Sequence, residues 1–298
     1  MAGSTTKRRA SKKSTTPPPG HGVPGAARRG AKRRWRTAST SDRHELYELS
    51  VQNVEFEVDF IDRAWRSHRR RLASTLREDF CGTFAASVEW VARRPSNIAM
   101  AIDLDADVLE WGRRRNLPKL PEAEHERLDI RNENVLDRRI EKVDCVVAMN
   151  FSYYIFKKRA ELLDYFRRVH GSLVKDGLFI LDAYGGSDSF REVEEERHLD
   201  GFTYVWDQNH YNPITGDVVN HIHFRFPDGS QMRKAFTYRW RLWTLAEIQE
   251  TLLEAGFRST TVYWEGTNHR TGEGNGKFRP SSRGEACEGW IAYIVAER

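Results

Sequence analysis

Apolar and polar residues follow two different periods along this chain, and the change of period divides it. From residue 42 to residue 186, stretches with apolar residues every three to five positions alternate with short, mostly apolar runs. The first kind predicts amphipathic helices and the second predicts buried strands, so this region should form an α/β fold around a parallel sheet. The same alternation resumes at residue 244.

Seven strands are expected in this sheet. They lie at Leu76–Glu78, Ile98–Ile102, Arg127–Ile130, Val143–Met149, Leu178–Leu181, Thr260–Trp264 and Trp290–Val295. Helices are expected at Asp42–Leu72, Thr83–Arg93, Ala106–Arg115, around Leu162–Leu173 and at Leu245–Glu254. Asp105 and Thr244 are predicted to be N-caps, because their side-chain oxygens can accept hydrogen bonds from the first free N–H groups of a helix. The glycine-containing segment 266–286 is expected to be a flexible loop.

Residues 200–242 change to a period of two, which predicts an antiparallel β insertion between the fifth strand and the last helix. Its strands are expected at Gly201–Asp207, Val218–Phe226 and Met232–Leu242, with turns at Thr215-Gly216 and Asp228-Gly229. One face of these strands carries Ile, Phe, Tyr, Trp and Leu, whereas the other carries His, Arg and Thr. Burial of apolar area should place the aromatic face against the rest of the protein.

The turn after the first strand carries the clearest chemistry. Glu78 ends the strand, Gly82 turns the chain into a helix, and Asp103 follows the next strand. Backbone N–H groups at such a turn meet the polar part of a nucleoside-containing cofactor, and the distal carboxylate accepts hydrogen bonds from ribose hydroxyls. The three cysteines are far apart and have no metal-ligand spacing, so no metal site is expected.

This turn resembles motif I of the class I S-adenosylmethionine-dependent methyltransferases, which runs hydrophobic, hydrophobic, acid, x, Gly, x, Gly, x, Gly. Alignment on the Cys-Gly-Thr at 81–83 places Glu78 on the acid and Gly82 on the middle glycine. Phe80 and Phe84 replace the outer two glycines. They argue against a nicotinamide dehydrogenase, because a pyrophosphate needs glycines for close backbone approach. The resemblance covers about 65–186 and resumes at 244.

The resemblance implies a doubly wound, seven-stranded, mostly parallel sheet with the β insertion as a lid. It implies a methyltransferase that uses S-adenosyl-L-methionine and a small-molecule acceptor. The residues that it places at the cofactor are Glu78, Phe80, Cys81, Gly82, Asp103, Leu104, Asn134, Val135 and Asn150. In this family a helix ahead of the first strand often lies over the cofactor, which makes Tyr47 and Gln52 possible further contacts.

Methyl transfer by direct displacement depends mostly on alignment of donor and acceptor, and it needs a base only if the acceptor must lose a proton. The candidate bases are His221, His223 and Tyr153, and the candidate acceptor contacts are Tyr154, Arg225, Arg239 and Arg241. The arginines suggest a small anionic acceptor, a carboxylate or a phosphate. In the alternative interpretation, nearby acids neutralise these cations: Glu192, Glu194, Glu195, Glu196 and Asp207.

The basic charge of the chain belongs to its N-terminal segment. Residues 1–40 contain eleven Lys or Arg and no acid, and subtracting these eleven charges from the net charge of +5 leaves −6 for residues 41–298. With few large apolar side chains and a run of prolines, this segment should be a disordered tail, and the methyltransferase domain should span 41–298. The tail fits a nucleic-acid-binding arm, a nuclear signal, an organelle transit peptide or a plain solubilising extension.

The rival function from another class is a nucleic-acid (RNA) binding or methylating protein that uses the basic tail. The net acidic body argues against it, because grooves for nucleic acid are usually lined with basic residues. No apolar run is long enough for a membrane-spanning helix. Together with three widely spaced cysteines, this predicts a soluble protein of a reducing compartment, most simply the cytoplasm. The sequence does not indicate an oligomeric state.

Overall fold

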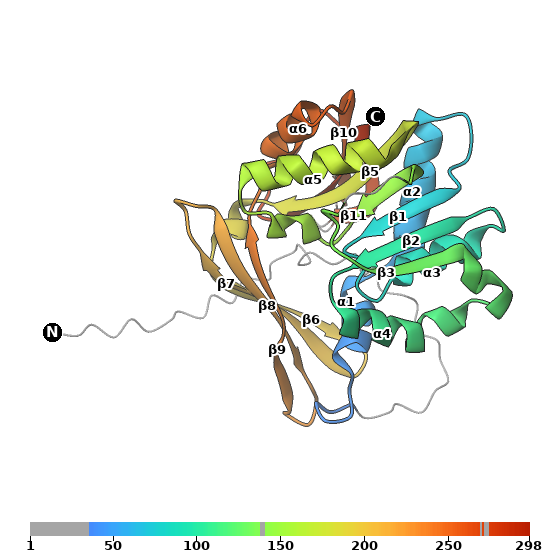
Figure 1. Ribbon diagram of the computed structural model, residues 1–298. Helices are drawn as coiled ribbons and strands as arrows, with labels where there is room; N and C mark the ends of the chain where they lie inside the picture. Colours follow the sequence, from blue (N-terminus) through green and yellow to red (C-terminus); the bar gives the residue numbers. More distant parts are fainter. Residues whose placement is uncertain (1–35, 138–140, 269, 271–273) are drawn as a thin grey trace.

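Two β-sheets organise the part of the chain that the computed structural model describes, residues 36–137, 141–268, 270 and 274–298. The larger sheet has the strand order β11-β10-β12-β5-β4-β1-β2-β3 (Figure 1). Its strands are β1 (Thr75–Asp79), β2 (Ile98–Asp103), β3 (Leu128–Asn132), β4 (Val143–Ala148), β5 (Leu173–Gly185), β10 (Ser259–Thr267), β11 (Gly274–Pro280) and β12 (Trp290–Glu297). Strands β1 to β5 are parallel, and β12 is antiparallel to β5 and β10. The predicted doubly wound order is confirmed, with its reversal between β1 and β4.

Helices cover both faces of the larger sheet. They are α2 (Val54–His68), α3 (Ala85–Arg93) and α4 (Ala106–Arg115) on one face, and α5 (Arg159–Ser172) and α6 (Leu245–Glu254) on the other. Accordingly, Phe60, Trp90 and Leu109 belong to one buried cluster, whereas Phe166 and Ile248 belong to a second. Short 3₁₀ turns lie at Leu117–Lys119, Glu122–Arg127, Ser152–Ile155 and Ser187–Phe190. No helix in the described ranges is both long and apolar enough to cross a bilayer.

The larger sheet has eight described strands rather than the expected seven, because β11 forms within the segment that was expected to be a flexible loop. Three residues of β11 are glycine or asparagine, which are uncommon in strands, so the sequence does not indicate a strand there. Phe278 supplies the missing apolar contact, since its ring lies 4.8 Å from that of Tyr293 and 5.8 Å from that of Phe56. Tertiary packing therefore makes this edge strand where local preference predicts a loop.

The second sheet is the predicted β insertion, extended by one unexpected edge strand. Its order is β6 (Val193–Leu199), β7 (Phe202–Tyr211), β8 (Asp217–Arg225) and β9 (Gln231–Arg241), all antiparallel. Gly216 and Gly229 occupy the predicted turns with positive φ. The apolar face is buried as expected, with Trp206 and Ile222 almost inaccessible to solvent. Figure 1 shows this sheet to one side of the larger one, beside helix α1.

The N-terminal region differs from the single helix that the sequence suggested. Helix α1 (Arg43–Val51) ends before Asn53, whose side chain accepts from the N–H of Phe56 at 3.2 Å and begins α2. Because the helix is broken there, α1 does not continue the direction of α2. It packs instead on β9 through the rings of Tyr47 and Phe236, whose centroids are 5.0 Å apart.

The described residues begin at 36, and residues 36–40 contact the rest of the structure. Arg36 forms an ion pair with Glu45 at 3.0 Å, and the N–H of Ala38 donates to the Ser230 hydroxyl at 2.9 Å. Residues 36–40 were expected to be part of the tail, but these contacts fasten them to α1 and to the β8–β9 turn. The remaining tail residues, 1–35, lie outside the described residues.

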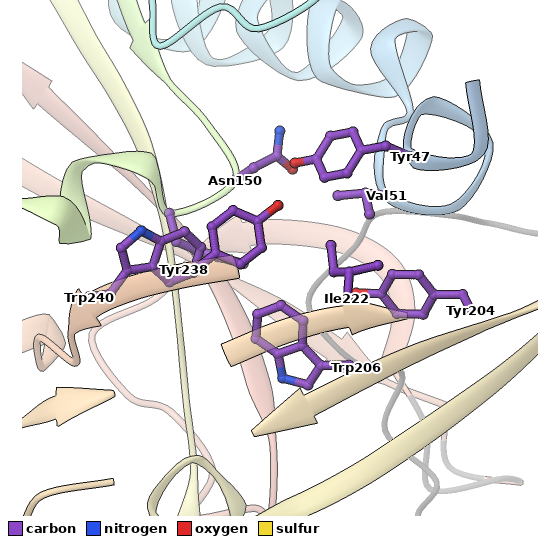
Figure 2. A pocket seen from close by; sticks show the side chains of 9 residues that line it. Tyr47, Val51, Asn150, Tyr204, Trp206, Ile222, Tyr238 and Trp240 are labelled. Atoms are coloured by element: carbon purple, nitrogen blue, oxygen red, sulfur yellow. The ribbon is translucent and has the colours of Figure 1, made fainter. Parts of the chain in front are cut away.

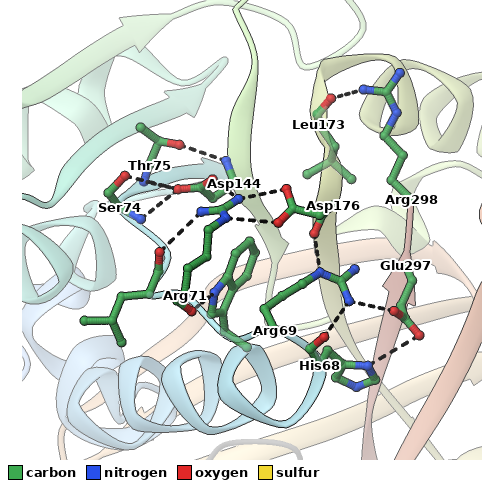
Figure 3. A network of polar contacts seen from close by, with 12 residues as sticks. His68, Arg69, Arg71, Ser74, Thr75, Asp144, Leu173, Asp176, Glu297 and Arg298 are labelled. Carbon is green, nitrogen blue, oxygen red and sulfur yellow. Dashed lines mark hydrogen bonds and ion pairs between the residues drawn. The ribbon is translucent and has the colours of Figure 1, made fainter.

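A polar network fastens the amino ends of the parallel strands, at the edge of the sheet away from the turn after β1 (Figure 3). Arg71 contacts Asp144 at 2.7 Å and Asp176 at 2.8 Å, and Arg69 contacts Glu297 at 2.8 Å. Burial opposes ionisation of Glu297, but hydrogen bonds from Arg69 and Ser259 outweigh it and lower its pKa to about 2. These contacts therefore join the segment after α2 to β4, β5 and β12 at this edge of the sheet.

Candidate active site

The turn after β1 keeps the backbone shape of a glycine-rich turn although two of its glycines are absent. Phe80, Gly82 and Phe84 all have left-handed backbone angles, with φ of +58°, +53° and +48°. Such angles cost a non-glycine residue roughly 1 kcal/mol or more, so packing must hold the two phenylalanines there. A Cβ on Gly112 of α4 would lie only 2.4 Å from a ring carbon of Phe84. The glycine that allows close helix packing therefore stands on α4 instead of in the turn.

Gly82 and Asp103 join the ends of β1 and β2. The N–H of Gly82 donates to Oδ2 of Asp103 at 2.8 Å, and the N–H of Asp105 donates to Oδ1 at 2.9 Å. Each carboxylate oxygen keeps a second lone pair for a ligand hydroxyl. A Cβ on Gly82 would meet no atom within 4 Å, so the turn faces open space. Burial raises the pKa of Asp103.

Glu78 lies deeper than a typical ligand-binding acid. It is 7% exposed, and its Oε2 accepts from the N–H of Ser87 at 2.9 Å and from the Ser87 hydroxyl. Burial, with the charge of Glu57, raises the pKa of Glu78 to about 8 against the effect of the Ser87 hydrogen bonds. Glu78 therefore joins β1 to the start of α3 and holds a proton near neutral pH.

The ends of β3 and β4 complete this edge of the sheet. After β3, the Asn134 side chain accepts from the N–H of Leu136 at 2.9 Å, and Val135 is buried beside it. After β4, the N–H groups of Asn150 and Phe151 both donate to the Asp182 carboxylate at 2.9 Å. These bonds fix a sharp turn that presents the Asn150 side chain at the edge of the sheet.

Leu104, which follows Asp103, is 70% exposed and contributes an apolar surface at the same edge. The nine residues expected at the cofactor therefore gather where four parallel strands end, the usual location of a ligand in a doubly wound sheet. This clustering follows from the strand order and was the part of the site that the sequence predicted.

Helix α1 lies over the turn after β1. Glu48 accepts from the Thr83 hydroxyl at 2.6 Å and from the Asn116 side chain at 2.7 Å. These bonds join α1 to the turn and to the end of α4. The neighbouring Tyr47 faces the second sheet, so α1 connects the edge of the larger sheet to the β insertion.

A narrow pocket lies where α1, the turn after β4 and the second sheet meet (Figure 2). It is lined by Tyr47, Val51, Asn150, Phe151, Tyr204, Trp206, Ile222, Tyr238 and Trp240. None of these nine residues is charged. Figure 2 shows Tyr47 and Asn150 side by side at one end and Trp206 at the other. The lining is thus aromatic, with a few polar atoms at fixed places.

The structure does not bring His221 and His223 to this pocket. Both alternate with Ile222, which lines it, so their side chains lie on the opposite face of the second sheet. His223 accepts from the N–H of Lys234 at 2.7 Å through Nδ1 and pairs with Asp207 at 3.1 Å through Nε2. His221 contacts Thr237 at 2.9 Å. Strand alternation therefore directs both histidines away from this pocket, and the geometry does not support their expected role as bases there.

Tyr153 and Tyr154 are fully buried and act as anchors. The Tyr153 hydroxyl donates to the Asp182 carbonyl at 2.7 Å, and the Tyr154 hydroxyl donates to the Trp243 carbonyl at 3.2 Å. Burial raises the pKa of both phenols well above its usual value. A phenol that is buried, bonded and difficult to ionise is a poor base, so the structure contradicts the catalytic role expected for Tyr153. Tyr154 likewise lies outside the pocket lining.

The three arginines expected to clamp an anion are also outside the pocket lining. Arg225 pairs with Glu194 at 2.8 Å and with Glu196. Arg241 pairs with Glu247 at 3.0 Å and lies over the ring of Trp243, and Arg239 alternates with two lining residues. For Arg225 the alternative interpretation is confirmed, because the acids of β6 neutralise it.

Sequence reasoning missed the aromatic residues that do line the pocket, apart from Tyr47. Tyr238 and Trp240 were assigned to the aromatic face of the insertion, and Tyr204 and Trp206 were not singled out. The available signal was the density of tyrosine and tryptophan on one face of three short strands. Only the packing of this face on α1 and on the turn after β4 shows that a space remains between them.

Acidic groups dominate the electrostatics of this region. The charges of Glu57 and Asp103 both raise the pKa of Glu78, after burial. Those of Glu57 and Asp182 raise the pKa of Tyr47 in the same way. Three carboxyl groups, from α2, β2 and β5, therefore act on the centre of the site, and their negative charge favours a ligand with positive charge.

Solved structures with the same fold include an S-adenosylmethionine-dependent methyltransferase from Clostridium acetobutylicum, at 17% identity over 85% of this chain and 96% of that one, with a TM-score of 0.61. The sugar N-methyltransferase KedS8 from Streptoalloteichus follows at 16% identity over 92% and 99%, with a TM-score of 0.58. The amino pentose methyltransferase CalS10 from Micromonospora echinaspora, solved with S-adenosylmethionine bound, has 15% identity over 83% and 92%, with a TM-score of 0.58. No family model and no curated protein matches the sequence. The chain therefore has the Rossmann-like methyltransferase fold.

Proposed function

We propose that this protein is an S-adenosylmethionine-dependent methyltransferase that acts on a small-molecule acceptor. The observation that carries the proposal is the convergence of a left-handed turn facing open space, the Asp103 carboxylate and further acids at the carboxyl ends of β1 to β5. The cofactor carries a sulfonium and an ammonium group, and acidic surroundings favour both. The fold likeness to methyltransferases supports the same conclusion.

The residues present fit this cofactor. Asp103 has lone pairs available for the two ribose hydroxyls, and Leu104 and Val135 offer apolar surfaces for the adenine ring. The turn at Gly82 would hold the methionine part, where an added Cβ meets no protein atom. Glu78 lies behind the turn, where the positive charge of the bound ligand would favour the ionised form of its carboxyl group.

Bound there, S-adenosylmethionine supplies a methyl group on a sulfonium, and on transfer the bonding electron pair stays on sulfur. The protein's contribution is alignment and exclusion of water. Helix α1 and the second sheet cover the edge of the larger sheet, and the aromatic pocket would hold the acceptor against the methyl group. None of the nine pocket residues is a histidine or a carboxylate, so the pocket favours an acceptor that attacks without losing a proton to the protein.

The acceptor is proposed to be a small organic molecule, as it is for KedS8, a sugar N-methyltransferase, and CalS10, an amino pentose methyltransferase. A nucleic-acid acceptor is not favoured, since acids rather than basic residues act on the site. A cytoplasmic location is part of the proposal and agrees with the buried, unpaired Cys81 and Cys145.

Calorimetric titration of the full chain with S-adenosylmethionine tests the proposal. We expect saturable binding, and production of S-adenosylhomocysteine when the protein is incubated with labelled cofactor and a metabolite extract. Titration with NADH is the matched control. NADH contains the same adenosine as S-adenosylmethionine, but its pyrophosphate needs a glycine-rich turn. Tighter binding of NADH than of S-adenosylmethionine would contradict the assignment.

A further inference from the structure

Helix α1 is fastened to the turn after β1 through a carboxylate. Oε1 of Glu48 accepts from the Thr83 hydroxyl at 2.6 Å and from the side-chain N–H of Asn116 at 2.7 Å. Thr83 directly follows Gly82, where the turn faces open space and where the methionine part of the cofactor is proposed to lie. The Glu48 hydrogen bonds therefore hold α1 next to the position proposed for the cofactor.

The two donors of these hydrogen bonds have little access to water. Asn116 is fully buried, and Thr83 is 4% exposed. The Asn116 side chain also donates to the Thr83 carbonyl oxygen at 2.9 Å and accepts from Nζ of Lys119 at 2.6 Å, so both its amide hydrogens and its oxygen are in use. If Glu48 moves away, Asn116 and Thr83 each lose the acceptor of a buried donor, which costs free energy. The two bonds thus favour the position of α1 over the turn.

Helix α1 is also attached to the second sheet, beside which it lies in Figure 1. The Tyr47 hydroxyl is hydrogen-bonded to Tyr238 of β9, and the guanidinium of Arg197 in β6 donates to the Ser50 carbonyl oxygen. The helix has only nine residues and is separated from α2 by a break. A helix of this length is marginal on its own, so its contacts determine its position. Helix α1 therefore connects the second sheet to the cofactor turn, and Glu48 makes its link to the turn.

We propose that Glu48 is a positioning residue that holds α1 closed over the cofactor turn and thereby limits the rate of cofactor exchange. This inference rests on the proposed function. Because α1 lies over the turn, the cofactor enters and leaves only after the bonds from Thr83 and Asn116 to Glu48 have broken. Closure slows association and dissociation together, since the same bonds break in both directions. Closure over the bound cofactor also excludes water from the methyl group.

Stopped-flow binding of S-adenosylhomocysteine to the full chain tests the inference, with tryptophan fluorescence as the readout. Glu48→Ala should raise both the association and the dissociation rate constants at least threefold, so that the dissociation constant changes less than the dissociation rate. Glu48→Gln should stay within twofold of the unmodified protein, because its amide oxygen can accept the same two hydrogen bonds. Glu45→Ala is the matched control on the same helix and should also stay within twofold, since Glu45 contacts Arg36 rather than the turn.

Two results with Glu48→Ala would overturn the inference. Unchanged rate constants would show that Glu48 only stabilises the fold, and a faster dissociation with unchanged association would show that it contacts the ligand directly. If Glu48→Ala does not fold, hydrogen exchange of the unmodified chain decides. Saturating S-adenosylhomocysteine should slow exchange of the α1 amides at least threefold and leave those of α6 unchanged, and equal exchange of α1 with and without ligand would overturn the inference.

The titration with S-adenosylmethionine separates this inference from the proposed function. Saturable cofactor binding together with exchange rates that do not respond to Glu48→Ala overturns the role of Glu48 alone. Absence of binding by both S-adenosylmethionine and S-adenosylhomocysteine overturns the proposed function, and the role of Glu48 with it.

Discussion

The Asp103 carboxylate accepts a hydrogen bond from the backbone N–H of Gly82 at 2.8 Å, so the acid at the end of β2 also shapes the turn after β1. The same carboxylate accepts from the N–H of Asp105 at 2.9 Å. One side chain thus orders the two loops between which a nucleoside would lie. A change at Asp103 is expected to affect both the ligand contacts and the shape of the turn.

Asp103→Ala is expected to weaken S-adenosylmethionine binding by about 2–4 kcal/mol, because two charge-assisted hydrogen bonds to the ribose hydroxyls are lost. Calorimetry measures this change directly. Asp107→Asn, an exposed acid in the first turn of α4, is the control and should bind normally. An Asp103→Ala affinity within about threefold of the unmodified protein would show that the cofactor assignment is wrong.

Glu78 is expected to make cofactor affinity depend on pH. Its pKa of about 8 means that it is mostly protonated at pH 7 in the free protein. A cationic ligand favours the ionised form, so binding releases a proton, and affinity should rise with pH up to about 8, by at most tenfold per pH unit. Calorimetry at pH 7 in two buffers of different ionisation enthalpy detects this proton. Glu78→Gln should remove the pH dependence of cofactor affinity. A cofactor affinity of the unmodified protein that does not change with pH would contradict this role of Glu78.

Gly112→Ala is expected to destabilise the protein by about 2–3 kcal/mol, because the new Cβ would lie 2.4 Å from the Phe84 ring and 2.6 Å from the Thr83 carbonyl oxygen. Gly171→Ala is the matched control, since this helical glycine of α5 has no atom within 4 Å of an added Cβ. It should stabilise the protein by up to about 1 kcal/mol through helix propensity. Urea denaturation measures both, and equal effects would contradict the close packing at Phe84.

Glu297 is expected to contribute to stability over a defined pH range. Its pKa is lowered from 4.5 to about 2 in the folded state, so its contribution is complete above pH 4.5 and disappears as the pH falls through 2. Glu297→Gln should cost about 2–3 kcal/mol at pH 7 and much less near pH 2. Denaturant titrations at several pH values test this, with the exposed Glu254→Gln as a control that changes little. If Glu297→Gln lowers the free energy of unfolding by the same amount at every pH, the result would argue against the Arg69–Glu297 contact.

Two truncations are expected to differ. Deletion of residues 1–35 should leave the thermal midpoint and cofactor affinity unchanged. Deletion of residues 1–40 removes the Arg36–Glu45 ion pair and the Ala38–Ser230 hydrogen bond, so it should lower the midpoint by roughly 2–4 °C. Thermal scans of both proteins compare them. Identical midpoints would place the boundary of the folded body after residue 40.

The sequence by itself determined the larger sheet, because local signals there agree with the tertiary structure. Apolar runs mark β2, β4 and β5, and Asp105 caps α4 with its side chain as predicted. Period-two alternation and the glycines at 216 and 229 similarly predicted the antiparallel insertion. The order of these elements along the chain was enough to place Glu78, Gly82 and Asp103 at one edge of the sheet.

Only the tertiary structure decided which side chains line the pocket. Alternation along β8 separates the two faces but does not indicate which face closes on a ligand, so His221 and His223 were equally plausible beside Ile222. The break before Asn53 made the difference, because it directs α1 and Tyr47 onto the aromatic face. The left-handed angle of Phe84 also depends on a distant residue, Gly112, which leaves room for its ring. Long-range packing has no signal in a local pattern, and for that reason the sequence predicted the sheet and its cofactor edge but not the pocket.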